Sequence, residues 1–142
     1  MLKVVLDTNV LLSAILFGGK PRQILEAAFE GSIQTFVSQA MITELEGVLH
    51  RPKFGFNSQI SQNIASEIAA IAEWIEPTRH YAIIQDDPAD NDILDCAIEA
   101  SADYLVTGDN HLLKLVECNG VQIVNPDKFI GILINEKELG DP

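Results

Sequence analysis

Short apolar runs alternate with segments of helical periodicity along nearly the whole chain, and this alternation constrains the fold more than any other feature. The runs are brief, continuous and rich in β-branched residues, as in strands buried on both faces. They are VVL at 4–6, TFV at 35–37, YLV at 104–106 and VQIV at 121–124. Strands that alternate with helices form a parallel sheet with helices on both faces. We therefore expect an α/β fold of three layers, α/β/α, around a central parallel sheet of four to five strands.

The longest helical segment, residues 58–75, repeats isoleucine at spacings of four, four, three and four. Such a stripe lies along one face of a helix and is typical of core packing, although part of it could serve a protein interface. Trp74 comes near the end of this segment. We expect its side chain to pack in the core rather than to stack on a base.

Length and composition indicate a single globular domain. A chain of 142 residues can bury a core of its own, and we place the domain at residues 1–135 and a polar C-terminal tail at 136–142. No apolar stretch approaches the ~18 residues of a membrane span. The N-terminus leads directly into the first predicted strand, which leaves no room for a signal peptide, and two cysteines are too few for a disulfide framework. These features predict a cytoplasmic protein without membrane association.

Acidic residues dominate the charge of the chain. The 21 Asp and Glu residues stand against 9 Lys and Arg, which gives a formal net charge of −12. A protein that binds nucleic acid unaided usually has a basic face, and few basic residues are available here to form one. Acidic groups can instead be concentrated around divalent cations, which then supply positive charge.

Four acids are predicted to meet at one edge of the sheet. Asp7 follows VVL and Asp109 follows YLVTG, so both lie at the carboxyl ends of strands, where open α/β sheets bind ligands. Asp90 is predicted at the start of a helix, and Glu44 in the first turns of the helix after TFVS. Carboxylates packed together repel one another unless a cation lies between them, and all-oxygen ligands select hard ions such as Mg²⁺ or Mn²⁺. Such a cluster suits metal-assisted phosphodiester hydrolysis.

Each acid also has a structural interpretation. An Asp after a strand often caps the next helix, and Glu44 could be a solvated helix residue, with Glu46 as the ligand in its place. The region of the third acid offers five candidates within ten residues: Asp86, Asp87, Asp90, Asp92 and Asp95. Asp87 before Pro88 could simply shape the turn, and Asp92 should point elsewhere on the helix. We choose Asp90, with Asp95 as the next alternative.

Four segments together resemble the PIN domain family. They are VVLDTNVLLSAI near the N-terminus, TELEGVL, DPADNDILDCAIEASADYLVTGD and VQIVNPDKF, in that order over roughly residues 2–130. A hydrophobic residue followed by Asp-Thr-Asn would be a weak signal alone, whereas four segments in order are specific. The similarity is greatest to the VapC-like nucleases, which are the toxins of toxin-antitoxin systems.

The resemblance implies a Rossmann-like PIN fold and an endoribonuclease that uses one or two Mg²⁺ or Mn²⁺ ions and leaves a 5′-phosphate and a 3′-hydroxyl. The family's catalytic, metal-binding acids fall on Asp7, Glu44, Asp90 and Asp109. Supporting positions fall on Thr8, Asn9 and Thr107. The implied partners are an RNA substrate, an antitoxin protein and a second copy of the chain in a homodimer.

The few basic residues are the candidates for contacts with the RNA backbone. They form two short clusters that contain Lys20 and Arg22 in one, and Arg51 and Lys53 in the other. Both clusters could equally be solvated loops, and His111 is interpreted as a surface residue.

Two other functions remain open. A catalytically inactive PIN-like module would act through its partner alone, although all four acids are present. A haloacid-dehalogenase-like phosphatase also has an Asp after its first strand, but it needs a second acid two residues later, where this chain has Asn9.

Overall fold

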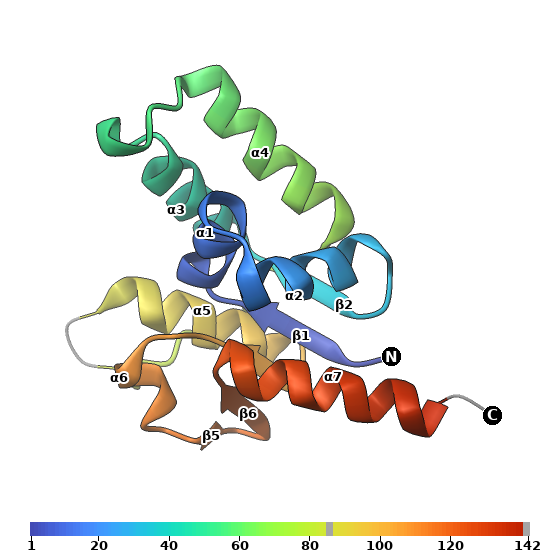
Figure 1. Cartoon of the computed structure of the whole chain (residues 1–142). Helices are drawn as coiled ribbons and strands as arrows, with labels where there is room; N and C mark the ends of the chain where they lie inside the picture. The colour runs from blue at the N-terminus through green and yellow to red at the C-terminus, as the bar shows by residue number, and fades with distance from the viewer. Residues whose placement is uncertain (85–86, 141–142) are drawn as a thin grey trace.

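The computed structural model describes residues 1–84 and 87–140, and side chains as far as residue 136. A central sheet flanked by helices gives the α/β architecture that the sequence predicts (Figure 1). The strands are β1 (Lys3–Leu6), β2 (Gln34–Val37), β3 (Glu73–Trp74), β4 (Tyr104–Val106), β5 (Glu117–Cys118) and β6 (Val121–Val124). The helices are α1 (Thr8–Leu16), α2 (Gly19–Phe29), α3 (Gln39–Leu49), α4 (Ser58–Ile71), α5 (Pro88–Glu99), α6 (Asn110–Leu113) and α7 (Pro126–Gly140), with a 3₁₀ turn η1 (Pro52–Phe54).

The strand order in the described sheet is β3-β2-β1-β4-β6-β5. The strands from β3 to β6 in this order are parallel, which confirms the expected parallel sheet, and β5 adds a short antiparallel strand beside β6. From β1 the chain builds outward to β2 and β3, and it then returns to place β4 on the other side of β1. The strand order therefore reverses between β1 and β4, and such switch points are where doubly wound sheets bind ligands.

The core lies around the two middle strands. Val4, Val5, Leu105 and Val106 have no exposed surface, because β1 and β4 have neighbours on both sides and helices over their faces. Helix α5 packs against β1, β2 and β4, while α2 contacts α1 and α7. This buried centre fixes the positions of the residues that follow β1 and β4.

The prediction for Trp74 was wrong. Helix α4 ends at Ile71, and Ala72 is already extended with φ −104° and ψ 155°. The chain then pairs with β2, where the Ile75 amide donates to the Val37 carbonyl at 2.8 Å. Trp74 belongs to this edge strand and is 47% exposed, because pairing with β2 ends the helix before the isoleucine pattern ends.

Helices α3 and α4 pack against each other and extend away from the sheet as a pair, joined by η1 at the far end (Figure 1). Ser38 caps α3 by accepting a hydrogen bond from the Met41 amide at 3.3 Å. In α4 the isoleucine stripe is only partly core, since Ile68 is 5% exposed whereas Ile60 is 42% exposed.

The last helix, α7, continues through Gly140, so residues 136–140 extend it. The domain boundary at residue 135 stays a prediction. Within the described part of the chain, none of the helices is both long enough and apolar enough to span a membrane.

Candidate functional site

Asp7 is held at the carboxyl end of β1. Its amide donates to the Val106 carbonyl of β4 at 3.0 Å, and its side chain is 3% exposed. The Thr107 hydroxyl donates to Asp7 Oδ2 at 2.6 Å, and the Asn9 amide lies 3.5 Å from Oδ1 at the start of α1. Burial raises the pKa of Asp7, the Thr107 hydrogen bond opposes that rise, and the negative charge of Asp109 adds to it.

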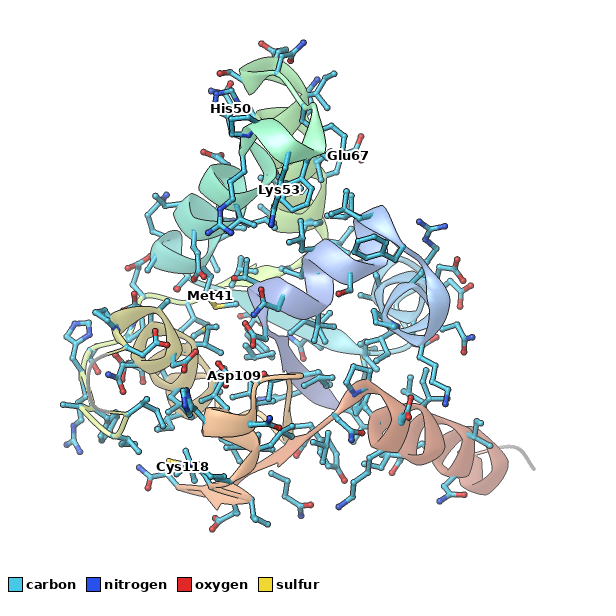
Figure 2. All side chains as sticks on the ribbon, turned by 60° about the vertical axis from the view of Figure 1, so that its left-hand side comes forward. Met41, His50, Lys53, Glu67, Asp109 and Cys118 are labelled. Atoms are coloured by element: carbon cyan, nitrogen blue, oxygen red, sulfur yellow. The ribbon has the colours of Figure 1, made fainter. Side chains whose placement is uncertain are left out.

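Thr107 links Asp7 to the end of the neighbouring strand β4. This residue is fully buried, and its hydroxyl also accepts a hydrogen bond from the Asp109 amide at 3.0 Å. Asp109 in turn caps α6, because its Oδ1 accepts from the His111 amide at 2.8 Å. One hydroxyl therefore positions both strand-end acids (Figure 2 labels Asp109).

Asp90 is the buried acid of the cluster. Asp87 caps α5 by accepting from the Asp90 amide at 3.3 Å, and Pro88 occupies the first turn, where proline fits. The Asp90 side chain is 6% exposed, and its Oδ2 has no hydrogen-bond partner among the described residues. Burial and then the charges of Asp109, Asp87 and Asp7 raise the pKa of Asp90 to about 7.

Glu44 faces this cluster from α3 and is half-buried. Burial is the main cause that raises the pKa of Glu44, followed by the negative charges of Asp7, Asp87 and Asp92. The positive charge of Arg51 opposes this rise. Of the four acids proposed from the sequence, Asp90 and Asp109 have ligand atoms within 4.8 Å of each other. Asp7 and Glu44 are near enough for their charges to affect the pKa values of this group of acids, and a shared metal site for all four stays a prediction.

Two residues that the sequence analysis did not choose lie in the cluster: Asp87, a candidate for the third acid that could simply shape the turn, and His111, interpreted as a surface residue. Ligand atoms of Asp87, Asp90, Asp109 and His111 all lie within 4.8 Å of one another. His111 Nδ1 is 3.7 Å from Asp109 Oδ1. The signal that could have identified His111 is its place two residues after Asp109, in the turn that Asp109 caps.

The donor set fits a hard divalent cation. Carboxylate oxygens are the ligands that Mg²⁺ and Mn²⁺ prefer, and an imidazole nitrogen is compatible with Mn²⁺. Asp90 Oδ2 is a buried oxygen without a partner, and such an atom is costly unless a ligand satisfies it. Burial is the main cause that raises the pKa values of Asp7, Glu44 and Asp90, and the negative charges of neighbouring acids add to it, as expected for ligands without their cation.

Asp95 lies outside this cluster. Its Oδ1 accepts from the Tyr81 amide at 2.8 Å, its Oδ2 lies 3.1 Å from His80 Nδ1, and its side chain is 3% exposed. Two further residues of α5 bind the loop that contains Tyr81. The Asn91 side chain forms hydrogen bonds with the backbone of Ile84, and the Glu99 carboxylate accepts hydrogen bonds from Thr78. Spacings of four residues on α5 place these three side chains on one face, where they hold residues 78–84 against the helix.

This contact predicts a structural role for Asp95. Asp95→Ala should lower the free energy of unfolding by about 2 kcal/mol, since the Tyr81 amide loses its acceptor. The increase in melting temperature on addition of Mn²⁺ should remain that of the wild type. Asp92→Ala is the matched control on α5 and should cost less in stability. A loss of the Mn²⁺ response in Asp95→Ala would return Asp95 to the list of ligands.

The other supporting residues differ in their surroundings. Thr8 is 1% exposed, and its Oγ1 has no partner among the described side chains and backbone groups. Asn9 is exposed and reaches Asp7 only through its backbone amide. Asp86 lies outside the residues that the structure describes.

Two of the four basic residues are engaged elsewhere. Lys20 pairs with Asp127 at 3.0 Å, and the Arg22 guanidinium donates to the carbonyls of Ala14 and Ile15 at 3.0 and 3.2 Å. Arg51, just before η1, and Lys53, within it, are exposed, and Figure 2 labels Lys53 over the α3–α4 pair. Arg51 is close enough to lower the pKa of Glu44, so this cluster is the one associated with the acids.

Comparisons with known proteins agree with this geometry. The PIN domain model matches residues 3–111, a range that includes all four acids. The uncharacterized protein MJ1680 of Methanocaldococcus jannaschii is 30% identical over 129 residues, which cover 87% of this chain and 81% of that protein. A chain of VapBC2 from Rickettsia felis, bound to a DNA fragment from its promoter, superposes with a TM-score of 0.63 at 19% identity, covering 87% of this chain and 98% of that one. The last similarity concerns the fold, whereas the family model matches well over half of the sequence, and the chain belongs to the PIN domain family.

Proposed function

We propose that this protein is a metal-dependent endoribonuclease that hydrolyses RNA phosphodiester bonds. The observation that carries the proposal is the buried Asp90 Oδ2, which has no partner among the described residues and lies in a cluster with Asp87 and Asp109. A fold that only needed to be stable would not keep such an atom there, since an unsatisfied buried acceptor is destabilising. Membership of the PIN domain family supports nuclease chemistry at this place.

Asp7, Glu44, Asp90 and Asp109 would hold one or two Mg²⁺ or Mn²⁺ ions. When bound, such an ion activates water and neutralises the charge that develops on the leaving oxygen. The chain's own contribution is to fix the acids in advance. Thr107 holds Asp7 and Asp109 in one arrangement, and the Asp87 cap positions Asp90, so little reorganisation is needed when substrate binds.

The decisive experiment is cleavage of single-stranded RNA by the purified protein with Mn²⁺ and with EDTA. We expect metal-dependent cuts that leave 5′-phosphate and 3′-hydroxyl ends. Intact RNA under all conditions would favour the inactive binding module. Turnover of p-nitrophenyl phosphate without RNA cleavage would favour the phosphatase.

Arg51 and Lys53 are the proposed contacts with the RNA backbone, because Lys20 and Arg22 already have partners. The double variant Arg51→Ala/Lys53→Ala should raise the KM for RNA about tenfold at low salt, with a smaller change in kcat. The two positive charges would contact the RNA backbone but take no part in the chemical step. Lys20→Ala/Lys128→Ala removes two positive charges at exposed positions elsewhere and serves as the control. Equal effects of both variants on KM would assign the result to net charge alone.

We further propose that the nuclease is the toxin of a toxin-antitoxin pair. The support is the shared fold with a chain of VapBC2, and the partner would then be an antitoxin protein. A homodimer and a cytoplasmic location belong to the same proposal. Co-expression with the neighbouring open reading frame, followed by copurification, would test the pairing.

A further inference from the structure

His111 is the nitrogen donor of the acidic cluster among the described residues. Its ligand atom and those of Asp87, Asp90 and Asp109 all lie within 4.8 Å of one another. Metal bonds of about 2.1 Å place two donors on opposite sides of an ion roughly 4.2 Å apart. Small side-chain rotations would therefore bring the four atoms onto one ion, and the imidazole can make such a rotation because it is exposed.

The backbone brings His111 to this place. Asp109 Oδ1 accepts a hydrogen bond from the His111 amide at 2.8 Å, so the imidazole begins at a residue that is tied to the Asp109 carboxylate. The other two donors belong to the start of α5, which Asp87 caps and where Asp90 lies in the first turn. The four donors thus come from two separate segments, residues 87–90 and 109–111.

The imidazole of His111 is not occupied by a hydrogen bond. The histidine rings that form hydrogen bonds within the described residues are those of His50 and His80. His111 Nδ1 lies 3.7 Å from Asp109 Oδ1, which is too long for a hydrogen bond. Adjacent and opposite donors of one ion would be roughly 3.0 and 4.2 Å apart, so this separation lies in the range of two atoms that share a cation.

A second observation points to a cation among these groups. Asp90 is 6% exposed, and its Oδ2 has no hydrogen-bond partner among the described residues. Its ligand atom lies within 4.8 Å of those of the other three residues, so the buried carboxylate is directed toward them. Such a carboxylate beside two further acids is destabilising without a cation, which distinguishes this cluster from acids that merely share an exposed surface.

We propose that His111 is a nitrogen ligand of the cation held by Asp87, Asp90 and Asp109, and that it makes the site prefer transition ions such as Mn²⁺ to Mg²⁺. Mg²⁺ takes oxygen ligands and keeps several waters, whereas imidazole is a ligand of the first-row transition metals. An imidazole therefore adds affinity for the transition ion and little for Mg²⁺. The inference rests on the metal site of the proposed function, but not on RNA cleavage.

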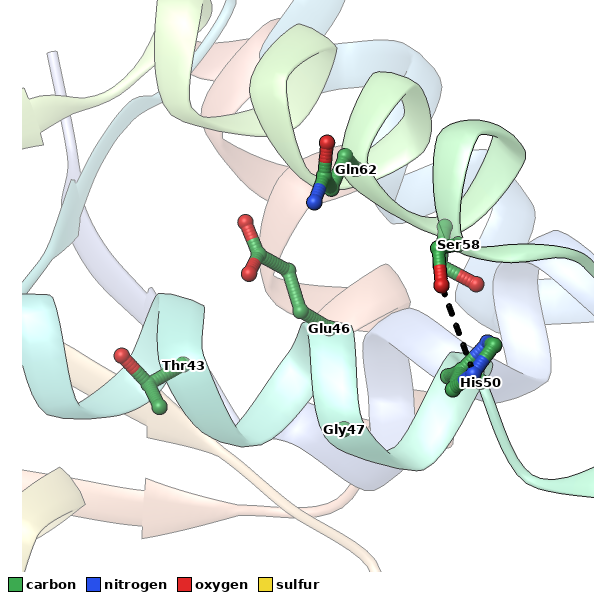
Figure 3. Close-up of a pocket in the computed structure, with 7 residues that line it drawn as sticks. Thr43, Glu46, Gly47, His50, Ser58 and Gln62 are labelled. Carbon is green, nitrogen blue, oxygen red and sulfur yellow. Dashed lines mark hydrogen bonds between the residues drawn. The ribbon is translucent and has the colours of Figure 1, made fainter.

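Electron paramagnetic resonance of Mn²⁺ bound to the full chain tests the ligand directly. At pH 8, with less than one Mn²⁺ per chain, spin-echo modulation should show a directly bound ¹⁴N nucleus, and His111→Ala should abolish this signal. His50→Ala is the matched control and should keep the signal, because His50 is also exposed but lies outside the cluster and bonds Ser58 at 3.4 Å (Figure 3). A nitrogen signal that survives His111→Ala would overturn the inference.

Calorimetric titrations measure the preference between the two ions. His111→Ala should weaken Mn²⁺ binding about tenfold and Mg²⁺ binding by about twofold or less, since only the transition ion loses a ligand that it prefers. Asp87→Asn is the contrasting variant, because asparagine can still cap α5 while the charged ligand is lost. It should weaken both ions by similar factors. Equal losses of Mn²⁺ and Mg²⁺ in His111→Ala would refute the preference.

The same measurements distinguish this inference from the proposed nuclease. A wild type that binds Mn²⁺ through nitrogen but leaves RNA intact would refute the nuclease and support His111 as a ligand. A wild type that cleaves RNA with Mn²⁺ but gives no nitrogen signal would refute this inference alone. A protein that binds no Mn²⁺ at all would refute both.

Discussion

Asp7→Asn should reduce RNA cleavage by about 10²- to 10⁴-fold while leaving the fold intact. The asparagine oxygen can still accept the hydrogen bond from Thr107, which the wild type makes at 2.6 Å. An amide is a poor ligand for a hard cation, and several kcal/mol of transition-state stabilisation depend on that ion. Single-turnover cleavage of a labelled RNA with millimolar Mn²⁺ measures the effect.

The matched control for Asp7→Asn is Asp127→Asn. Asp127 is exposed and pairs with Lys20 at 3.0 Å, so this change has the same chemistry and alters net charge equally. Full activity of Asp127→Asn, with circular dichroism unchanged in both variants, would assign the loss to the site. Undiminished cleavage by Asp7→Asn would exclude Asp7 from the reaction.

Asp90→Asn should raise the stability of the metal-free protein above pH 7 and abolish most of its response to Mn²⁺. The pKa of Asp90 is raised from 3.8 to about 7 in the folded chain, so between these values the folded state holds more protons than the unfolded state. Stability in EDTA therefore falls as the pH rises from about 4 to 7, and the loss is complete above pH 7. One pKa unit corresponds to about 1.4 kcal/mol, and with screening at the open sheet edge we expect a gain on the order of 2 kcal/mol for the variant.

Melting curves at pH 5 and pH 8, in EDTA and in millimolar Mn²⁺, test this prediction for the variant and the wild type. Metal should stabilise the wild type by roughly 2.7 kcal/mol at a hundredfold excess over its dissociation constant, and the variant by much less, because one ligand is gone. In EDTA the pH dependence should be flatter in the variant. A wild-type response to Mn²⁺ in Asp90→Asn would remove Asp90 from the metal site.

The sequence placed Asp7 and Asp109 at the carboxyl ends of strands, and the structure has both at one edge of the sheet, because parallel strands end on the same side. Their role as ligands stays a prediction. It also placed Asp90 in the first turn of a helix, which is α5 in the structure, although Asp87 rather than Asp90 caps that helix. It preferred Asp90 to Asp87 as the third acid, whereas both lie in the cluster, and it did not predict that Asp95 would be held by Tyr81 and His80. Those outcomes depend on how the loop before α5 binds the helix, and a local pattern carries no information about such contacts.

The same reason explains the end of α4 and the exposure of Trp74. Periodicity describes which face of a helix is apolar, but it does not say where pairing with a distant strand competes with the helix. Here the edge of β2 gains a partner at residues 73–74, and the helix ends two residues earlier. Propensity within the segment gave no sign of this competition.

The hydrogen bond from Thr107 to Asp7 joins residues that are 100 positions apart in the chain. The site therefore does not exist until β4 has been added beside β1, although Asp7 and Glu44 are synthesised early. A chain still emerging from the ribosome, or one truncated before residue 104, has neither Thr107 nor Asp109. Formation of the candidate site therefore depends on the pairing of β1 with β4, and a chain that lacks this pairing cannot bring Asp7 and Asp109 together.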